Sequence, residues 1–189
     1  KTGTLTEGRL DAELNVSEIS SHDLSVFYSM VRLSRHPVSR AIERVLIGKS
    51  LPVHVLKLEQ FNEKTGTGLF ARSNQMDYAL VRVDDSKSTF TESSFRKNGI
   101  EISRVLLKDH VRAESSSVVE SLKKKGLSVC ILSGDHEMPV RKLAHDLEVN
   151  QYFSLRSPES KSSLVMDEMM VGDGVNDALA LSKARVSMA

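Results

Sequence analysis

The sequence predicts an α/β protein in which a doubly wound parallel sheet is interrupted by an inserted α+β domain. Two observations lead to this prediction. From residue 99 onward, short apolar segments alternate with amphipathic ones at the spacing of successive strands and helices, which is typical of a parallel sheet covered on both faces. Residues 12–98 do not share this rhythm. We therefore expect one domain from residues 1–11 and 99–189, and a second domain from residues 12–98.

The composition is that of a globular protein. The 189 residues suffice for one large domain or two small ones, and the hydrophobic share of 40% and charged share of 27% are ordinary. A net charge of +1 gives no reason to expect nucleic acid as a partner. No apolar stretch approaches the roughly 20 residues that span a bilayer, so we expect this part of the protein to be soluble. The single cysteine, Cys130, excludes an internal disulfide and is expected in the core.

The inserted region is expected to open with two helices. Leu24–Leu33 carries apolar residues at helical spacing, and Pro37 is suited to begin a second helix over Val38–Ile47. The residue before a proline is disfavoured in a helix, so the break between the two falls at His36. Val53–Phe61 alternates loosely and suggests a strand.

A glycine-containing loop follows. Gly66 and Gly68 stand between that strand and two further strand candidates, Leu69–Ala71 and Tyr78–Val83. A lone Gly-x-Gly marks a tight hairpin more often than a nucleotide site. Residues 84–98 are polar, and no element is assigned to them.

The second half of the chain supplies the expected parallel sheet. Its predicted strands are Ile100–Leu107, Leu127–Leu132, Tyr152–Ser154, Met169–Val171 and Ala184–Met188. Its predicted helices are Ser115–Lys125, Val140–Leu147, one that begins after Ser157 and one that begins at Asp177.

Four loops should meet where the strands of this sheet end, because ligands bind at the carboxyl edge of open α/β sheets. They are residues 1–6, 133–135, the region of Lys161, and 172–177. Asp173 and Asp177 can face one point, and two hard oxygen ligands beside a helix N-terminus suit Mg²⁺ and a phosphate. Asp177 could equally be a helix N-cap. Together the loops offer hydroxyls, N–H groups, a cation and two carboxylates, which is the inventory for phosphoryl transfer.

The motifs in combination resemble those of P-type ATPases. They are Lys1–Gly8 (KTGTLTEG), Asp109 with Arg112, Ser133–Asp135, Pro158–Lys161 and Gly172–Leu179, in the order of that family. The resemblance implies a haloacid-dehalogenase-like phosphorylation domain at residues 1–11 and 99–189, with a nucleotide-binding domain inserted at 12–98. His36-Pro37 is similar to the His-Pro pair of the heavy-metal-transporting branch. That branch usually has a glutamate at the position of Val31 and often an acid at that of Arg35.

The resemblance also implies roles for individual residues. ATP would be held by His36, Gly66 and Gly68. Mg²⁺ would be held by the main-chain carbonyl of Thr2 and by Asp173, with Asp177 orienting its shell. The phosphoryl group would be bound or stabilised by the catalytic set, which comprises Lys1, Thr4, Ser133, Gly134, Lys161 and Asn176.

The function implied is that of the ATP-binding and phosphorylation portion of a heavy-metal cation pump, lying on the cytosolic side of an integral membrane protein. Its partners would be ATP with Mg²⁺ and the membrane helices and actuator domain of the same parent chain. The transported ion, copper first, would not bind to this portion. A phosphatase of the same superfamily and a non-catalytic nucleotide-binding module remain alternatives.

Two departures from the family pattern bear on this interpretation. The aspartate that accepts the phosphoryl group in the family is expected just before Lys1. Lys161 and Gly172 are only eleven residues apart, which leaves little room for a helix and a returning strand, so residues are expected to be missing near 166–169.

Overall fold

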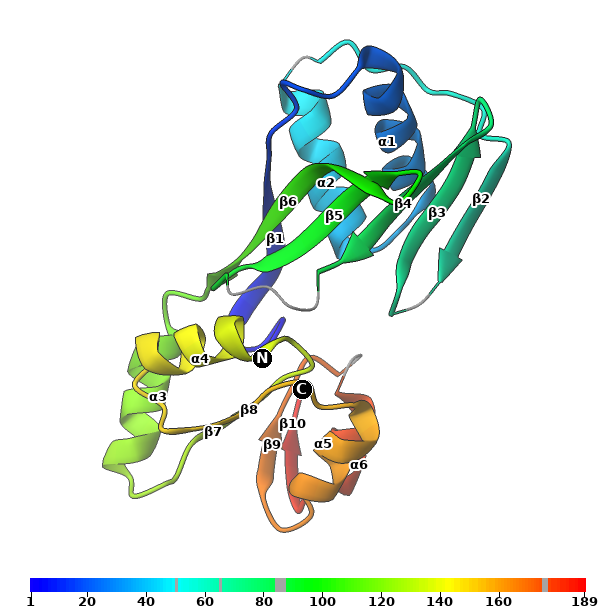
Figure 1. Cartoon of the computed structure of the whole chain (residues 1–189). Helices are drawn as coiled ribbons and strands as arrows, with labels where there is room; N and C mark the ends of the chain where they lie inside the picture. The colour runs from blue at the N-terminus through cyan, green and yellow to red at the C-terminus, as the bar shows by residue number, and fades with distance from the viewer. Residues whose placement is uncertain (50, 65, 84–87, 175–176) are drawn as a thin grey trace. The chain divides into compact units, whose positions relative to one another are not determined.

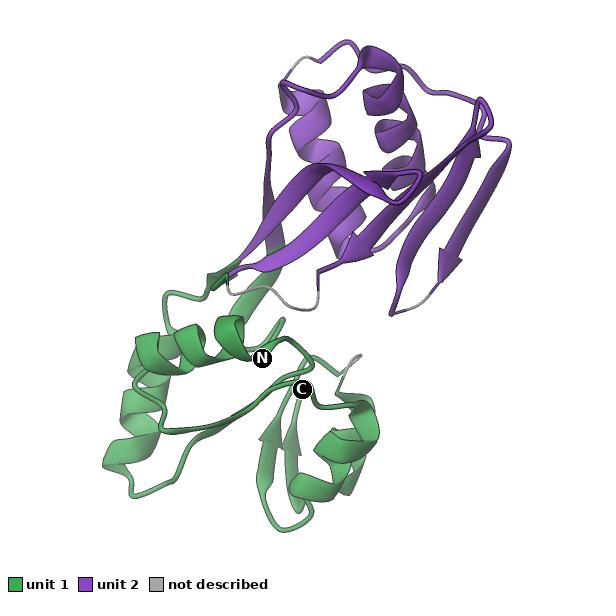
Figure 2. Ribbon diagram, in the orientation of Figure 1, with its two compact units in different colours: residues 1–9, 87–89, 109–189 green, residues 10–86, 90–108 purple. Residues whose placement is uncertain are grey.

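The computed structural model describes every residue of the chain except 50, 65, 84–87 and 175–176. The chain divides into two compact units, which Figure 2 colours separately. Unit 1 contains Lys1–Arg9 and Asp109–Ala189, with a short stretch that ends at Thr89. Unit 2 contains Leu10–Ser86 and Phe90–Lys108.

The chain returns from unit 2 near residue 108 rather than near residue 98, because the strand that follows Gly99 belongs to the sheet of unit 2. β6 (Ile100–Val111) pairs antiparallel with β5 (Thr91–Lys97). Asn98 and Gly99, with φ of 49° and 82°, make the turn between these strands. Asn-Gly is preferred in two-residue hairpins that need positive φ at both positions. The expected boundary thus fell on a hairpin turn.

Unit 2 is a six-stranded sheet with two helices on one face (Figure 1). The strand order is β1-β6-β5-β4-β3-β2, and the pairings from β2 to β6 are antiparallel. The remaining elements are β1 (Thr6–Leu14), α1 (Ser21–Leu33), α2 (Pro37–Gly48), β2 (Gln60–Lys64), β3 (Gly68–Ser73) and β4 (Met76–Arg82).

Both helices form where the sequence predicts them, and so do β3 and β4. The strand expected at Val53–Phe61 is wrong for most of its length, since residues 51–58 are in no strand. This segment is instead held against α1 by two buried serines. The Ser25 hydroxyl accepts from the N–H of His54 at 3.2 Å, and the Ser29 hydroxyl accepts from that of Leu56 at 2.8 Å.

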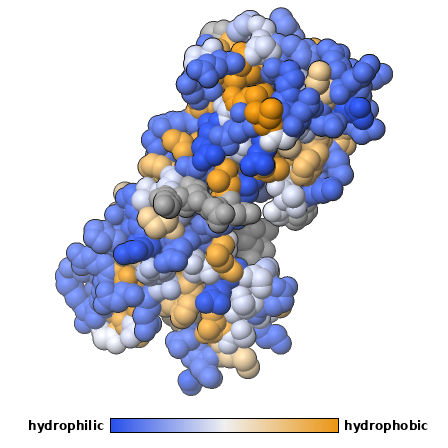
Figure 3. Space-filling view, in the orientation of Figure 1, coloured by the Kyte–Doolittle hydropathy of each residue, from blue (hydrophilic) through white to orange (hydrophobic). Residues whose placement is uncertain are grey.

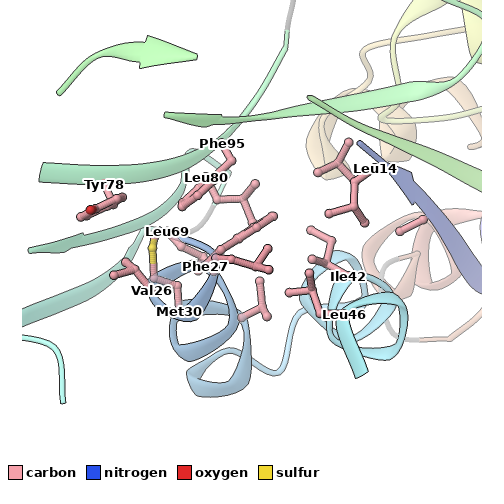
Figure 4. Close-up of a cluster of buried hydrophobic side chains, with 14 of the residues drawn as sticks. Leu14, Val26, Phe27, Met30, Ile42, Leu46, Leu69, Tyr78, Leu80 and Phe95 are labelled. Atoms are coloured by element: carbon pink, nitrogen blue, oxygen red, sulfur yellow. The ribbon is translucent and has the colours of Figure 1, made fainter. Parts of the chain in front are cut away.

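Aromatic rings join the helices to the sheet in the core of unit 2 (Figure 4). The rings of Phe27 and Phe95 stack with centroids 4.1 Å apart, and Tyr78 lies 5.9 Å from Phe95. Each fully buried aromatic side chain stabilises the fold by about 1.5–3 kcal/mol relative to an exposed one. Position Val31, where the related branch usually has glutamate, is also fully buried in this core.

The N-terminus of α1 is fixed to the sheet by a buried carboxylate. Asp23 Oδ1 accepts from the Tyr78 hydroxyl at 2.6 Å and from Lys97 Nζ at 2.9 Å, while Ser20 donates to Oδ2 at 2.8 Å. Burial alone would raise the pKa of Asp23, but the hydrogen bonds from Tyr78, Lys97 and Ser20 outweigh it, and that pKa is lowered. Burial and the bond to Asp23 raise the pKa of Tyr78.

The described residues of unit 1 form two parallel strand pairs and four helices. β7 (Cys130–Leu132) pairs with β8 (Gln151–Phe153), and β9 (Met169–Val171) pairs with β10 (Val186–Met188). In the described residues the two pairs do not join into the single sheet that was expected. The helices are α3 (Ser115–Lys124), α4 (Glu137–Asp146), α5 (Pro158–Leu164) and α6 (Ala178–Lys183).

One sequence expectation in unit 1 needs correction, and a second concerns the connection from α5 to β9. Cys130 is exposed rather than buried, because β7 begins only at this residue and its neighbour Ile131 takes the inward position. The connection from α5 to β9 is a short turn closed by a 3.1 Å bond from the Glu168 N–H to the Val165 carbonyl. α5 has only seven residues, and the expectation that residues are missing near 166–169 stays a prediction.

No helix among the described residues is long and apolar enough to cross a membrane. On the face that Figure 3 shows, apolar residues reach the surface in small patches separated by hydrophilic ones.

Candidate functional site

The first residues of the chain form a tight polar turn. The main-chain carbonyl of Lys1 accepts from the N–H groups of Thr4, Leu5 and Thr6 at 3.0–3.3 Å. Gly3 adopts a φ of 77° at the centre of this turn, a conformation that costs other residues about 1–2 kcal/mol. The Thr4 hydroxyl is buried and has no hydrogen-bond partner in the described part of the chain. It is therefore available to a ligand.

Arg112 holds this turn from outside. Its Nε donates to the carbonyl of Thr6 and its Nη2 to that of Gly3, both at 3.2 Å, and its own N–H donates to the Leu5 carbonyl at 3.0 Å. Sequence reasoning grouped Arg112 with the motifs but assigned it no role.

The ammonium of Lys1 joins the turn to the loop after β7. Lys1 Nζ lies 2.7 Å from Asp135 Oδ2, and the Ser133 hydroxyl donates to the same oxygen at 3.1 Å. The Asp135 N–H in turn donates to the Ser133 oxygen at 3.1 Å. Gly134 stands between them, and a Cβ there would lie 3.4 Å from the carbonyl of Arg156. The Ser133–Asp135 loop is thus fixed by its own contacts, with Asp135 as the partner of the Lys1 ammonium.

A second carboxylate, Asp109, flanks the same lysine. Its Oδ2 accepts from the Thr6 hydroxyl at 2.6 Å and lies 3.8 Å from Lys1 Nζ, while its Oδ1 is buried with no hydrogen-bond partner in the residues described. Burial raises the pKa of Asp109, and neither the Thr6 bond nor the Lys1 charge cancels that effect. Sequence reasoning grouped Asp109 with the motifs but assigned it no role. Its place just after the predicted strand Ile100–Leu107 was the signal that could have suggested one.

Lys161 and Asp177 form a buried ion pair across unit 1. Lys161 Nζ lies 2.7 Å from Asp177 Oδ1, and the two side chains are only 11% and 3% exposed. Ser157 caps α5 by accepting from the Ser160 N–H, which fixes the helical turn that carries Lys161. Asp177 precedes α6 but makes no side-chain cap bond to it. The structure therefore gives Asp177 a lysine partner in place of the predicted cap.

Two glycines allow the aspartates to lie close to the main chain. A Cβ at Gly172 would lie 2.7 Å from Asp177 Cβ, and a Cβ at Gly3 would lie 3.0 Å from Asp173 Cβ. The second contact brings the Lys1–Thr6 turn against Asp173, which joins the first predicted loop to the last.

Electrostatics connect the same segments. The charges of Asp177, Lys161 and Asp135 all act at the main-chain nitrogen of Lys1. All four predicted loops therefore lie within electrostatic range of one position. Asn176, which was assigned to the same site, lies outside the described residues.

The oxygen donors suit a hard divalent cation. No group of three or more His, Cys, Asp or Glu side chains in the described residues could hold a metal alone. Mg²⁺ usually keeps several waters and takes one or two carboxylates together with substrate phosphates. Asp173 beside Gly3, with the exposed Thr2 one residue away, fits that mode. Asp177 is engaged with Lys161, so its contribution to such a cation would be indirect.

In unit 2, His36 caps α2. Its Nδ1 accepts from the Val38 N–H at 3.3 Å, and its own N–H donates to the Ser34 hydroxyl at 3.1 Å. The ring is otherwise exposed. Ser34 also donates to Glu63 Oε1 at 2.9 Å, which joins the α1–α2 connection to the end of β2.

The two glycines of the Gly-x-Gly loop differ in their surroundings. Gly68 pairs with Val81, and a Cβ there would lie 2.2 Å from the Leu80 carbonyl oxygen, so the sheet itself requires glycine. Gly66 has a φ of 75° and nothing within 4 Å of a Cβ. Only the space at Gly66 is open to a ligand. Because Ser34 binds the strand that leads into this hairpin, His36 and Gly66 lie at the same end of unit 2.

Comparison with known proteins decides the family. A family model described as haloacid dehalogenase-like hydrolase matches residues 1–162. The chain belongs to this family. As a haloacid dehalogenase-like hydrolase it is 30% identical over 206 aligned positions to the nitrogen fixation protein FixI of Rhizobium leguminosarum bv. viciae. It is 32% identical over 213 positions to the copper-exporting P-type ATPase B of Archaeoglobus fulgidus. Both comparisons cover all of this chain but only 26% and 30% of the relatives, so this hydrolase spans less than a third of their length.

Solved structures agree. A structure of the catalytic CPx-ATPase domain CopB-B has a TM-score of 0.80 and 32% identity, over 99% of this hydrolase and 74% of that chain. A second structure, from work on the conformational changes of the CopB-B catalytic domain upon nucleotide binding, has a TM-score of 0.79 and 31% identity, with the same shares of both chains covered. The resemblance to heavy-metal P-type ATPases and the fold class are thereby confirmed. Both alignments with relatives exceed the 189 residues of this hydrolase, so those proteins carry residues that it lacks.

Proposed function

We propose that this chain is the ATP-binding and phosphorylation portion of a heavy-metal cation pump, which couples ATP hydrolysis through an aspartyl-phosphate to ion export across a membrane. The single observation that carries the proposal is the convergence of the Lys1–Thr6 turn, Ser133–Asp135, Lys161 and the pair Asp173 and Asp177. The four segments together combine cations, hydroxyls and carboxylates around one position.

Each residue has a role that its contacts support. Lys161 would neutralise the charge of the phosphoryl group, and Asp177 holds its ammonium in place. The unpartnered Thr4 hydroxyl and the Gly134 N–H would donate to phosphoryl oxygens, and the Ser133 hydroxyl would turn from Asp135 to do the same. The Lys1 ammonium, fixed by Asp135, keeps the turn and the Ser133 loop together. The nucleophile would be an aspartate directly before Lys1. Asn176 would assist in orienting the phosphate.

Mg²⁺ would be held by Asp173 and the main-chain carbonyl of Thr2. When bound, it would neutralise charge on the transferring group. Unit 2 would hold the ATP at His36 and beside Gly66, with Gly68 shaping the hairpin. Val31 is buried in the core, and its side chain has no carboxylate to contact the adenine base.

The rest of the pump would lie outside this portion. We expect membrane helices and an actuator domain in the same parent chain, with this portion on the cytosolic side. The cargo would be a heavy-metal ion, copper first, bound by the membrane helices.

The test is phosphoenzyme formation by a chain extended by one N-terminal aspartate. We expect [γ-³²P]ATP with Mg²⁺ to leave an acid-stable, hydroxylamine-sensitive label, and the Lys161→Met variant to lose it. ATP binding with no label in the extended chain would point to a non-catalytic nucleotide-binding module. Turnover of small phosphate esters without ATP binding would point to a phosphatase.

A further inference from the structure

Arg82, the last residue of β4, carries a guanidinium in which two of the three nitrogens are buried without partners in the described residues. Its Nε and Nη2 are both buried, and neither has a hydrogen-bond partner in the part of the chain that the structure describes. A guanidinium presents five donors and stays charged at any pH that a protein tolerates. Buried donors without acceptors are costly, so a partner from outside the chain would relieve the cost.

The side chain lies on the face of the sheet that the helices cover. Leu80, two residues earlier on the same strand, is 4% exposed, and Figure 4 shows it pointing toward the helices. Residues two apart on a strand share a face, so Arg82 shares this one. Its cross-strand partner Ser93 is likewise buried, and Val105 on the next strand is fully buried.

Arg82 also lies at the end of the sheet where His36 and the Gly-x-Gly hairpin are found. Val81 pairs with Gly68, which places Arg82 beside the hairpin. Glu63, which binds Ser34, pairs with Leu69, and Leu69 pairs with Leu80. Two strand spacings across the sheet and two residues along it put the Cα atoms of Glu63 and Arg82 about 12 Å apart. An extended nucleoside triphosphate can bridge that distance.

We propose that the Arg82 guanidinium binds the phosphate chain of the nucleotide in unit 2. This inference rests on the proposed ATP-binding function and adds a residue that the sequence motifs do not mark. Phosphate oxygens accept two parallel N–H bonds from a guanidinium, which a base edge or a ribose hydroxyl matches less well. The bound phosphate would supply acceptors to both buried nitrogens and neutralise their charge.

The experiment titrates ATP and adenosine separately into the full chain and its Arg82→Gln variant by calorimetry. We expect ATP affinity to fall about tenfold or more and adenosine affinity to change less than about twofold, because only ATP carries the phosphates. Arg72→Gln is the matched control, since Arg72 lies in the same sheet but is exposed and paired with Glu59 and Asp77. It should leave both affinities unchanged. An equal loss for ATP and adenosine, or no loss for either, would overturn the proposal.

A thermal melt gives a second, independent readout. Without nucleotide, Arg82→Met should hold or raise the melting temperature, because it removes buried donors that lack acceptors. A lower melting temperature would mean that the guanidinium has a protein partner, and would also overturn the proposal. A His36→Asn variant in the same titrations separates a failure of the inference about Arg82 from a failure of the proposed ATP-binding function. If His36→Asn weakens ATP binding and Arg82→Gln does not, the inference about Arg82 alone fails. If the unaltered chain binds no ATP, the proposed function fails with it.

Discussion

Lys161 Nζ lies 2.7 Å from Asp177 Oδ1, in a pair that is almost completely removed from solvent. The pair joins α5 to α6 and fixes the buried Lys161 ammonium, which is proposed to neutralise the phosphoryl group. A buried pair depends on both partners, because either charge alone would be left without compensation.

Replacing Lys161 with methionine is therefore expected to lower the free energy of unfolding of unit 1 by about 3 kcal/mol. The double variant Lys161→Met/Asp177→Leu should recover most of that loss, because neither charge then remains buried. Urea denaturation followed by circular dichroism measures both. Lys142→Met is the control, since its pair with Asp146 is equally short, 2.6 Å, but exposed. Its effect should stay below about 1 kcal/mol. Equal losses at Lys142 and Lys161 would contradict the argument.

Gly172 lies directly against the Asp177 side chain. A methyl group at this position would meet Asp177 Cβ at 2.7 Å, so Gly172→Ala must displace the carboxylate and with it the Lys161 ammonium. We expect a loss of about 1–3 kcal/mol in stability and a weaker phosphoenzyme signal in the chain extended by aspartate. Gly48→Ala, which has nothing within 4 Å of the new methyl and ends α2, should be neutral or stabilising. Normal phosphorylation in Gly172→Ala would count against the assigned roles.

His36 has a structural role and a proposed binding role, and two substitutions separate them. His36→Ala removes the cap of α2 and should cost about 1 kcal/mol of stability as well as ATP affinity. His36→Asn keeps a capping side chain, so it should retain stability and still lose ATP affinity. Thermal melts and calorimetric titration report the two quantities. If His36→Asn binds ATP as the unaltered chain does, the ring has no role beyond the cap.

Asp23 makes the stability of unit 2 sensitive to acid. Its pKa in the folded chain is lowered from the ordinary value of 3.8, so its contribution is fully present above that value and is lost as the pH falls through the folded pKa. We expect the free energy of unfolding to drop as the pH falls below about 4, with a smaller drop in Asp23→Asn. At pH 7, Asp23→Asn should itself be destabilised by about 1–3 kcal/mol. A parallel pH dependence of the two chains would exclude Asp23 as the cause.

The sequence predicted the elements with strong local signals. The helix start after Ser157, the break at His36 and the helical spacing of α1 are each read from residues only a few positions apart, so no distant contact is needed to interpret them. The convergence of the four loops was expected from strands of one parallel sheet ending at one edge. In the described residues the loops come together without that single sheet, through the contacts of Lys1, Gly3 and Lys161.

The strands that were missed had weaker or hidden signals. β1 alternates Leu10, Ala12 and Leu14 with charged residues, a period-two pattern that the polar start of the chain obscured. β5 buries Glu92, Ser93 and Ser94, so its composition resembles that of a loop. The ion pair at Asp177 could not be predicted, because it depends on the distance between two loops far apart in the sequence.

In the described residues, β7 and β9 each pair along one edge only. The other edge of each presents a row of main-chain donors and acceptors, with the exposed side chains of Met169 and Val171 alongside it on β9. Such an edge accepts a strand from any neighbouring molecule. Concentrated solutions of this length of chain should therefore oligomerise through strand addition, and ligand titrations are best made at the lowest protein concentration that gives a signal.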